Sequence, residues 1–242
     1  MRFKNKVCLI TGATSGIGRA VALQMGREGG CVAVLGRDVA DGRAVVSEIK
    51  AAGGEAIFVR ADVGRDTSLQ AAVKKILDAW GRVDVLVSNA AMMTFKPLLK
   101  LDPKEWDEVM NVNLRALFRL TQLCLPHMKR GSIVADSSVH AHQTTPNVVP
   151  YAASKGAIEA LVRGLSLEIP HTHARINAVA PGAVDTPMLW SNPNVKSGKE
   201  KITGQVGTPN ELAAAICFMA SPEANFINGT TLVVDGGRLA SL

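Results

Sequence analysis

The sequence contains few aromatic residues and few cysteines, and both scarcities exclude kinds of site. Aromatic residues make up 4% of the 242 residues, so neither a stacking platform for single-stranded nucleic acid nor a sugar-binding cleft built on rings is expected. The four cysteines are scattered through apolar stretches without a C-x-x-C pair; they are Cys8, Cys31, Cys124 and Cys217. Such cysteines are typical of small core residues in a reduced, cytoplasmic protein.

Long runs of charge and of apolar residues are also missing. The formal net charge is +6, but no run of lysine and arginine is longer than two residues. This pattern argues against a nucleic-acid partner and leaves attraction of phosphorylated cofactors or anionic substrates. No apolar run approaches the roughly 18 residues of a membrane span, and the apolar residues before Thr11 are too few for a signal peptide. We therefore expect a soluble, cytoplasmic protein without a membrane partner.

The pattern of histidines predicts no metal site. His171 and His173 are close in sequence, but they lack the carboxylate or cysteine partners that would complete a metal-binding cluster. An exposed loop is the expected setting for this pair.

Short apolar runs, rich in β-branched residues, alternate with amphipathic stretches of about 12 to 25 residues. The predicted strands are Val7–Thr11, Val32–Leu35, Ala56–Arg60, Val83–Val87, Ser132–Ala135, Arg175–Val179 and Thr231–Val234. The pattern predicts one α/β domain over residues 1–242, a doubly wound, Rossmann-like parallel sheet of about seven strands with helices on both faces. Residues 187–207 have weak periodicity and loop composition, which predicts a substrate loop.

The first predicted strand runs directly into a glycine-rich octet, and a helical pattern follows. The octet is Thr11-Gly12-Ala13-Thr14-Ser15-Gly16-Ile17-Gly18. Glycine lets the backbone turn tightly and approach a ligand, while a helix N-terminus offers N–H groups to a pyrophosphate. A tight turn without a ligand is the alternative, but the position at the first strand–helix junction favours a dinucleotide. The spacing T-G-x-x-x-G-x-G resembles that of the short-chain dehydrogenase/reductase family.

The resemblance also bears on the choice between the two nicotinamide dinucleotides. Arg37 follows the second predicted strand, where relatives that use NAD often carry aspartate. A guanidinium suits a 2′-phosphate, so the resemblance favours NADP over NAD. Two residues favour NAD: Asp38 could reach the ribose itself, and Ser15 occupies a position that is often basic in NADP users. A solvated Arg37 at the start of a helix is a further alternative.

Three more segments resemble cofactor contacts of the family. Asp62-Val63 matches the pair whose carboxylate binds the adenine amino group, although Asp62 could instead cap a helix from Thr67. Ser88-Asn89-Ala90-Ala91 stands where the family shows Asn-Asn-Ala-Gly, and alanine at the last position would cost about 1 kcal/mol if φ were positive. Pro181-Gly182-Ala183-Val184-Asp185-Thr186 resembles the P-G-x-V-x-T segment, which implies that Val184 and Thr186 hold the nicotinamide carboxamide.

The stretch Tyr151-Ala152-Ala153-Ser154-Lys155 contains the only tyrosine of the chain. Tyrosine and lysine four residues apart project from one face of a helix. A phenol has a reference pKa of about 10, and an ammonium together with a positively charged nicotinamide would lower it. Ser138, thirteen residues upstream, fits the substrate oxygen better than Ser137 does by its spacing. Asn113 matches the family's helix asparagine that holds a water, although it could be a plain interior polar residue.

The resemblance therefore implies the catalytic tetrad Asn113, Ser138, Tyr151 and Lys155. The implied cofactor-binding residues are Gly12, Thr14, Ser15, Gly16, Ile17, Gly18, Arg37, Asp62, Val63, Asn89, Ala90, Ala91, Tyr151, Lys155, Pro181, Gly182, Val184 and Thr186. The implied reaction is hydride transfer between a nicotinamide cofactor and a small carbonyl or alcohol substrate, with Tyr151 as general acid or base.

Substrate and assembly are less defined by the sequence. Residues expected near the substrate are Met92, Met93, Phe95, His140, His142, Val148, Leu189 and Trp190. Sugars, acyl thioesters and other ketones or alcohols stay open as substrates. Apolar faces on the predicted helices over residues 111–128 and 152–169 resemble those that relatives pair, which implies a homo-oligomer, a tetramer. The alternatives to an oxidoreductase are a non-catalytic dinucleotide-sensing or scaffold protein, which would be free to lose Tyr151 or Lys155, and an epimerase or lyase.

Overall fold

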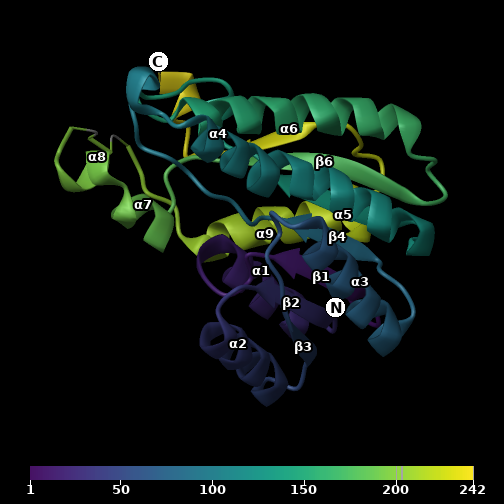
Figure 1. Cartoon of the computed structure of the whole chain (residues 1–242). Helices are drawn as coiled ribbons and strands as arrows, with labels where there is room; N and C mark the ends of the chain where they lie inside the picture. The colour runs from purple at the N-terminus through teal and green to yellow at the C-terminus, as the bar shows by residue number, and fades with distance from the viewer. Residues whose placement is uncertain (200, 203, 242) are drawn as a thin grey trace.

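The computed structural model describes residues 1–199, 201–202 and 204–241. Its centre is a seven-stranded sheet in the order β3-β2-β1-β4-β5-β6-β7, and every neighbouring pair is parallel (Figure 1). The strands are β1 Val7–Thr11, β2 Cys31–Gly36, β3 Glu55–Arg60, β4 Val85–Ser88, β5 Gly131–Asp136, β6 Ala174–Pro181 and β7 Thr231–Val234. The predicted doubly wound parallel sheet is confirmed, with strand ends within two residues of the predicted ones.

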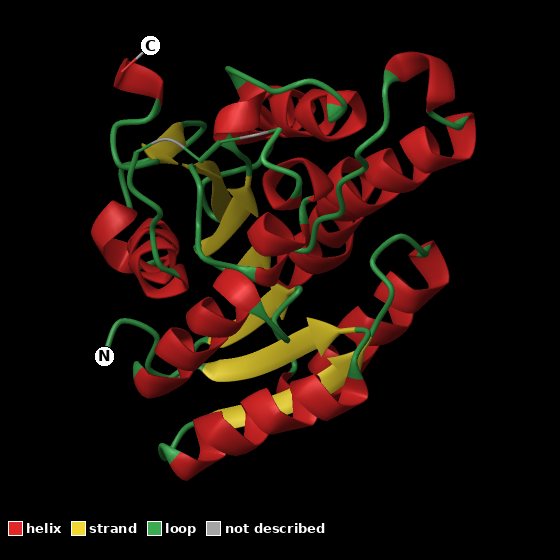
Figure 2. Ribbon diagram, turned by 90° about the vertical axis from the view of Figure 1, so that its left-hand side faces the viewer, coloured by secondary structure: helices red, strands yellow, loops and turns green. Residues whose placement is uncertain are grey.

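Helices cover both faces of this sheet (Figure 2). They are α1 Gly16–Arg27, α2 Val39–Ala51, α3 Asp66–Trp80, α4 Pro103–Met110, α5 Ala116–Cys124, α6 Val149–Glu168, α7 Pro187–Ser191, α8 Pro193–Lys196 and α9 Pro209–Ala220. Apolar side chains of α1, α2 and α9 share one core with the sheet, and those of α3, α5 and α6 share the other. Because both faces are covered, β1 and β6 are buried along their whole length.

The helix expected over residues 111–128 has a different form. Residues Asn111–Arg115 make a π-helical turn between α4 and α5, and a 3₁₀ turn, Leu125–His127, ends the run. A π turn inserts one extra residue into the helical repeat, so it changes the direction of the side chains around it. Asn113 lies within this turn and is buried.

The expected loop over residues 187–207 contains two short helices. Thr186 caps α7 by accepting a hydrogen bond from the N–H of Leu189, and Asn192 caps α8 in the same way from Asn194. These local caps, and the prolines at the start of both helices, explain why helices form here although the sequence has no helical pattern of apolar residues. Glu200 and Thr203, which belong to the same predicted loop, lie outside the described residues.

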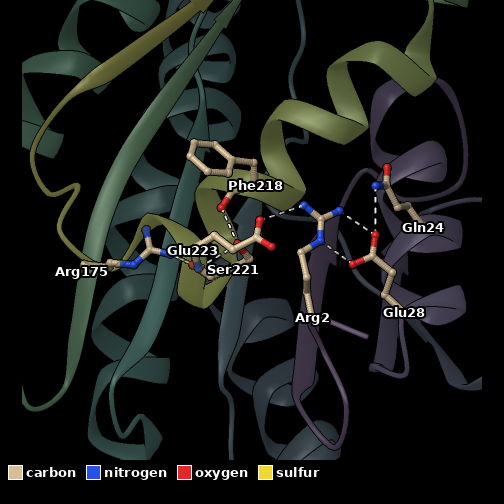
Figure 3. Close-up of polar contacts among 7 residues, drawn as sticks. All are labelled: Arg2, Gln24, Glu28, Arg175, Phe218, Ser221 and Glu223. Carbon is tan, nitrogen blue, oxygen red and sulfur yellow. Dashed lines mark hydrogen bonds and ion pairs between the residues drawn. The ribbon is translucent and has the colours of Figure 1, made fainter.

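Ion pairs connect the N-terminal segment to the rest of the fold at the amino ends of the strands (Figure 3). Arg2 lies 2.6 Å from the carboxylate of Glu28 and 3.8 Å from that of Glu223. Nearby, Arg175 on β6 donates a 2.7 Å hydrogen bond to the backbone carbonyl of Ser221. The carboxyl ends of the strands, where ligands of such sheets bind, lie at the opposite edge. Within the described part of the chain, every helix is too short or too polar to cross a bilayer.

Candidate active site

A cavity of about 610 Å³ lies at the carboxyl ends of the strands. Residues that follow β1, β2, β3 and β4 line it, and so does the last residue of β5. The chain crosses from one side of the sheet to the other between β1 and β4, which is where open α/β sheets bind ligands. The volume lies within the usual range of about 300 to 1,000 Å³ for ligand sites.

The glycine-rich turn between β1 and α1 forms one wall of this cavity. Gly12 and Gly16 have φ of +63° and +51°, a conformation that residues with a Cβ rarely adopt. At Gly18 a Cβ would overlap the carbonyl oxygen of Gly12 and the side chain of Asn89. Ser15, the N-cap of α1, makes no capping hydrogen bond with its side chain. The turn therefore leaves room and N–H groups for an anion, and it fits the pyrophosphate of a dinucleotide.

Thr11 and Asn89 fasten this turn to the segment after β4. The side-chain amide of Asn89 donates to the backbone carbonyl of Thr11 at 2.9 Å. The hydroxyl of Thr11 accepts from the N–H groups of Asn89 and Ala90 at 3.0 and 2.9 Å. Thr11 was not among the predicted site residues, although it belongs to the octet. Ala91 does not have a positive φ, so the expected strain of alanine at this position is absent.

The end of the cavity near β2 and β3 carries several arginines. Arg37 lines the cavity and also a neighbouring hollow, which Arg60 and Arg65 line as well. Asp38 accepts a hydrogen bond from the N–H of Asp41 and so caps α2.

The cap role that Asp62 could have had for α3 is not seen in the structure. The helix begins at Asp66 with Arg65 as its N-cap, and the carboxylate of Asp62 accepts from the N–H of Gly64 at 3.0 Å instead. Asp62 and Val63 both line the cavity.

Tyr151 and Lys155 lie on α6, beside a second cavity of about 130 Å³ that Tyr151 lines together with Ser138. The two side chains are 8% and 1% exposed, and the ammonium of Lys155 lies 5.4 Å from the centre of the Tyr151 ring. Lys155 donates a hydrogen bond to the backbone carbonyl of Asp136. Hydroxyl, phenol and ammonium therefore gather around one buried corner of the molecule.

Asn113 connects α6 to the segment after β4. Its amide exchanges hydrogen bonds with the backbone of Met92 at 2.8 and 3.0 Å and donates to the hydroxyl of Ser154 at 2.9 Å. Ser154 in turn donates to the backbone carbonyl of Tyr151 at 2.7 Å. Asn113 is therefore more than a plain interior polar residue, because it links two segments that form the site. Ser154 was missed as a site residue, although the motif around Tyr151 includes it.

Burial dominates the electrostatics of the phenol. It raises the pKa of Tyr151, the neighbouring Asp136 raises it further, and the hydroxyl of Ser138 lowers it. Burial also lowers the pKa of Lys155, while Asp136 raises it. The lowered phenol pKa that the sequence suggested is therefore not found in the protein alone, because desolvation and the Asp136 carboxylate outweigh the hydroxyl of Ser138.

The predicted cofactor residues are divided between the two cavities. Those that line the larger one are Gly12, Thr14, Ser15, Gly16, Ile17, Arg37, Asp62, Val63, Asn89, Ala90, Ala91, Tyr151 and Thr186. Pro181, Gly182 and Val184 line the smaller one, which Thr186 lines as well. Gly18 and Lys155 of this set line neither cavity, and neither does Asn113 of the predicted catalytic tetrad.

The residues expected near the substrate are also divided. Met93, His140 and Leu189 line the smaller cavity, and Met92 lines the larger one. The other four line neither cavity; they are Phe95, His142, Val148 and Trp190.

Comparisons with known proteins agree with this geometry. A family model described as enoyl-(acyl carrier protein) reductase matches residues 12–238. The 3-oxoacyl-[acyl-carrier-protein] reductase of Thermotoga maritima is 35% identical over 98% of this chain and 99% of its own length. The chain belongs to the short-chain dehydrogenase/reductase family. A short-chain dehydrogenase of Burkholderia cenocepacia, solved with NADP, superposes with a TM-score of 0.91 at 32% identity, over 98% of both chains.

Another solved relative of the short-chain dehydrogenase/reductase family has a different cofactor form and a bulky ligand. This 7α-hydroxysteroid dehydrogenase, in complex with NADH and 7-oxo glycochenodeoxycholic acid, has a TM-score of 0.90 and is 31% identical. It covers 98% of this chain and 95% of its own. Similar backbones therefore accompany NADP in one solved relative and NADH in another.

Proposed function

We propose that this protein is an NADP-dependent oxidoreductase that transfers a hydride between the nicotinamide and a small carbonyl or alcohol substrate. The observation that carries the proposal is the position of Tyr151, which lines both cavities and has Lys155 and Ser138 beside it. The larger cavity fits the dinucleotide, and the smaller one fits the reacting end of the substrate. Tyr151 is the general acid in reduction and the general base in oxidation.

When bound, the nicotinamide ring supplies or accepts the hydride. The hydroxyls of Ser138 and Tyr151 hold the substrate oxygen and polarise the carbon–oxygen bond. The raised pKa of Tyr151 keeps the phenol protonated at neutral pH, so it can give its proton to the oxygen in reduction. In oxidation the phenol must first lose that proton, and the ammonium of Lys155 stabilises the phenolate.

The lining of the smaller cavity favours a compact, mostly apolar reacting end. Met93, Val139, Leu189 and Ile202 contribute apolar surface, and His140 stands edge-on to the Tyr151 ring with centroids 5.6 Å apart. Methionine side chains adapt to substrates of different shape. A secondary alcohol or ketone on an apolar carbon skeleton suits this cavity better than a free sugar.

The arginines around the β2 end support NADP as the cofactor. Arg37, Arg60 and Arg65 share one hollow beside the cavity, and guanidinium groups are good ligands of a 2′-phosphate. Asp38, which could favour NAD, uses its carboxylate to cap α2.

The experiment measures oxidation of NADPH and NADH at 340 nm against ketones, sugars and acyl thioesters, with Arg37→Asp beside wild type. We expect faster turnover with NADPH, and a rise in its KM of about 100-fold in Arg37→Asp, equivalent to about 2.7 kcal/mol. Arg43→Asp, an exposed change on α2 that alters the net charge equally, is the control. Preference of the wild type for NADH would refute the cofactor assignment. Nucleotide binding without turnover of any substrate would favour a dinucleotide sensor.

A homotetramer is the assembly we infer for this chain. Phe118 on α5 is 40% exposed and Leu167 on α6 is 89% exposed. An apolar hollow with Leu114, Phe118 and Leu161 in its wall lies between the two helices. Burying these side chains against a second copy would remove apolar surface from water.

A further inference from the structure

Asp136, the last residue of β5, lines both cavities. Five residues line both of them; they are Ile17, Asp136, Tyr151, Thr186 and Met188. Tyr151 is the proposed acid and base, and Thr186 is a proposed nicotinamide contact. Among the described residues that line both cavities, Asp136 has the only carboxylate. This carboxylate therefore lies where the reacting ends of cofactor and substrate would meet.

Within the described residues, the fold leaves one carboxylate oxygen of Asp136 unpaired. Its Oδ1 is buried and has no hydrogen-bond partner among the described residues. The hydrogen bond from Lys155 goes to the backbone carbonyl of Asp136, so the side chain is not needed to hold the lysine. A buried polar atom without a partner is costly and is retained where a ligand or a function compensates for it.

The charges around Asp136 are few. Lys155 and Tyr151 approach it from α6, and His140 and Arg238 line the smaller cavity. Burial raises the pKa of Asp136 to about 6, and Lys155 acts against this rise. At pH 8 the carboxylate is therefore ionised, and its negative charge offsets the positive charge of Lys155 at the junction of the cavities.

We propose that Asp136 makes this protein bind the oxidised dinucleotide in preference to the reduced one, and so favours carbonyl reduction on the enzyme. The inference rests on the proposed function. An oxidised nicotinamide ring carries one more positive charge than a reduced ring, so a carboxylate beside it stabilises the oxidised form selectively. A protein shifts an equilibrium only by its different affinity for the two states. Tighter binding of the oxidised cofactor stabilises the bound oxidised cofactor and alcohol, so on the enzyme it favours reduction of a carbonyl and opposes oxidation of an alcohol by the same factor.

The test is the ratio of two dissociation constants, measured without substrate at pH 8. NADP⁺ and NADPH are each titrated calorimetrically into wild type, Asp136→Asn, Asp136→Glu and Asp78→Asn. Asparagine keeps the shape of Asp136 and removes its charge, and glutamate keeps the charge. Asp78 is exposed on α3 and pairs with Lys74 at 2.7 Å, so its variant changes the net charge equally at a distant place. Circular dichroism spectra establish that all four proteins are folded.

We expect Kd(NADPH)/Kd(NADP⁺) to fall about tenfold in Asp136→Asn, which corresponds to about 1.4 kcal/mol. The ratio should stay within twofold of wild type in Asp136→Glu and Asp78→Asn. An unchanged ratio in Asp136→Asn would overturn the inference, and so would an equal fall in Asp78→Asn. Failure of the wild type to bind either dinucleotide would instead overturn the proposed function. If NADP⁺ and NADPH both bind and the ratio is unaltered in Asp136→Asn, only the role of Asp136 is overturned and the proposed function stands.

Discussion

Replacing Asp136 by asparagine should stabilise the protein, and the gain should depend on pH. The pKa of this carboxyl is raised from its ordinary value of 3.8 to about 6, chiefly by burial. A raised carboxyl pKa means that the unfolded chain loses this proton at a lower pH than the folded chain does. The folded state is therefore disfavoured progressively as the pH rises from about 4 to about 6, and the full cost is present above pH 6.

The size of the effect follows from the two pKa values. The difference between 3.8 and about 6 corresponds to about 3 kcal/mol of unfolding free energy at neutral pH. Because the side chain lines a cavity, solvent reduces this to about 2 kcal/mol. For a protein of this size such a gain raises Tm by roughly 4 to 8 °C.

Urea denaturation of wild type and Asp136→Asn at pH 4, 5, 6, 7 and 8 measures the difference directly. Contributions of other carboxyl groups cancel between the two proteins. We expect the advantage of the variant to be near zero at pH 4 and complete at pH 7. A variant that is less stable than wild type at pH 8, or whose advantage does not change with pH, would refute the reasoning.

Three other predictions concern the glycine-rich turn, the N-terminal ion pair and the assembly. Gly18→Ala should weaken nucleotide binding at least about tenfold in calorimetric titrations, because the added methyl displaces Asn89 and opens the turn. Equal binding would contradict the role of the glycine-rich turn in binding the nucleotide. Glu28→Gln should cost about 0.5 kcal/mol in urea denaturation at pH 7. The hydrogen bond from Arg2 lowers the pKa of Glu28 from its ordinary value of 4.5. The stabilisation by this ion pair is therefore present above pH 4.5 and is lost as the pH falls below it. A stability difference between the two proteins that persists at pH 3 would contradict a role for the ion pair. Phe118→Glu should reduce the mass measured by light scattering from tetramer to a smaller species, and an unchanged mass would exclude that face.

Much of the fold could be predicted because a parallel sheet buried on both faces has apolar strands that periodicity detects. The β1 strand was predicted with its observed ends for this reason. The π turn at Asn111–Arg115 could not be predicted, because one extra residue in a helix hardly changes an apolar pattern. The short helices α7 and α8 depend on single caps, Thr186 and Asn192, rather than on periodicity.

The candidate site was predictable where a motif fixes the backbone, as at Gly12 and around Tyr151. Thr11 and Ser154 were missed because their roles depend on hydrogen bonds to distant segments, which spacing alone does not indicate. Asp136 was missed because an acidic residue at a strand end is usually solvated, whereas here one of its carboxylate oxygens is buried. The raised pKa of the phenol in the protein alone could not be predicted, because the extent of burial is a property of packing and not of the motif.

The most direct test of the whole account compares nucleotide binding and turnover in Tyr151→Phe. The exchange removes one buried oxygen and leaves the ring, so Kd for the preferred dinucleotide should stay within about threefold of wild type. Because the general acid is lost, kcat for a substrate that wild type reduces should fall about a thousandfold. Turnover that persists without the phenolic oxygen would contradict the account.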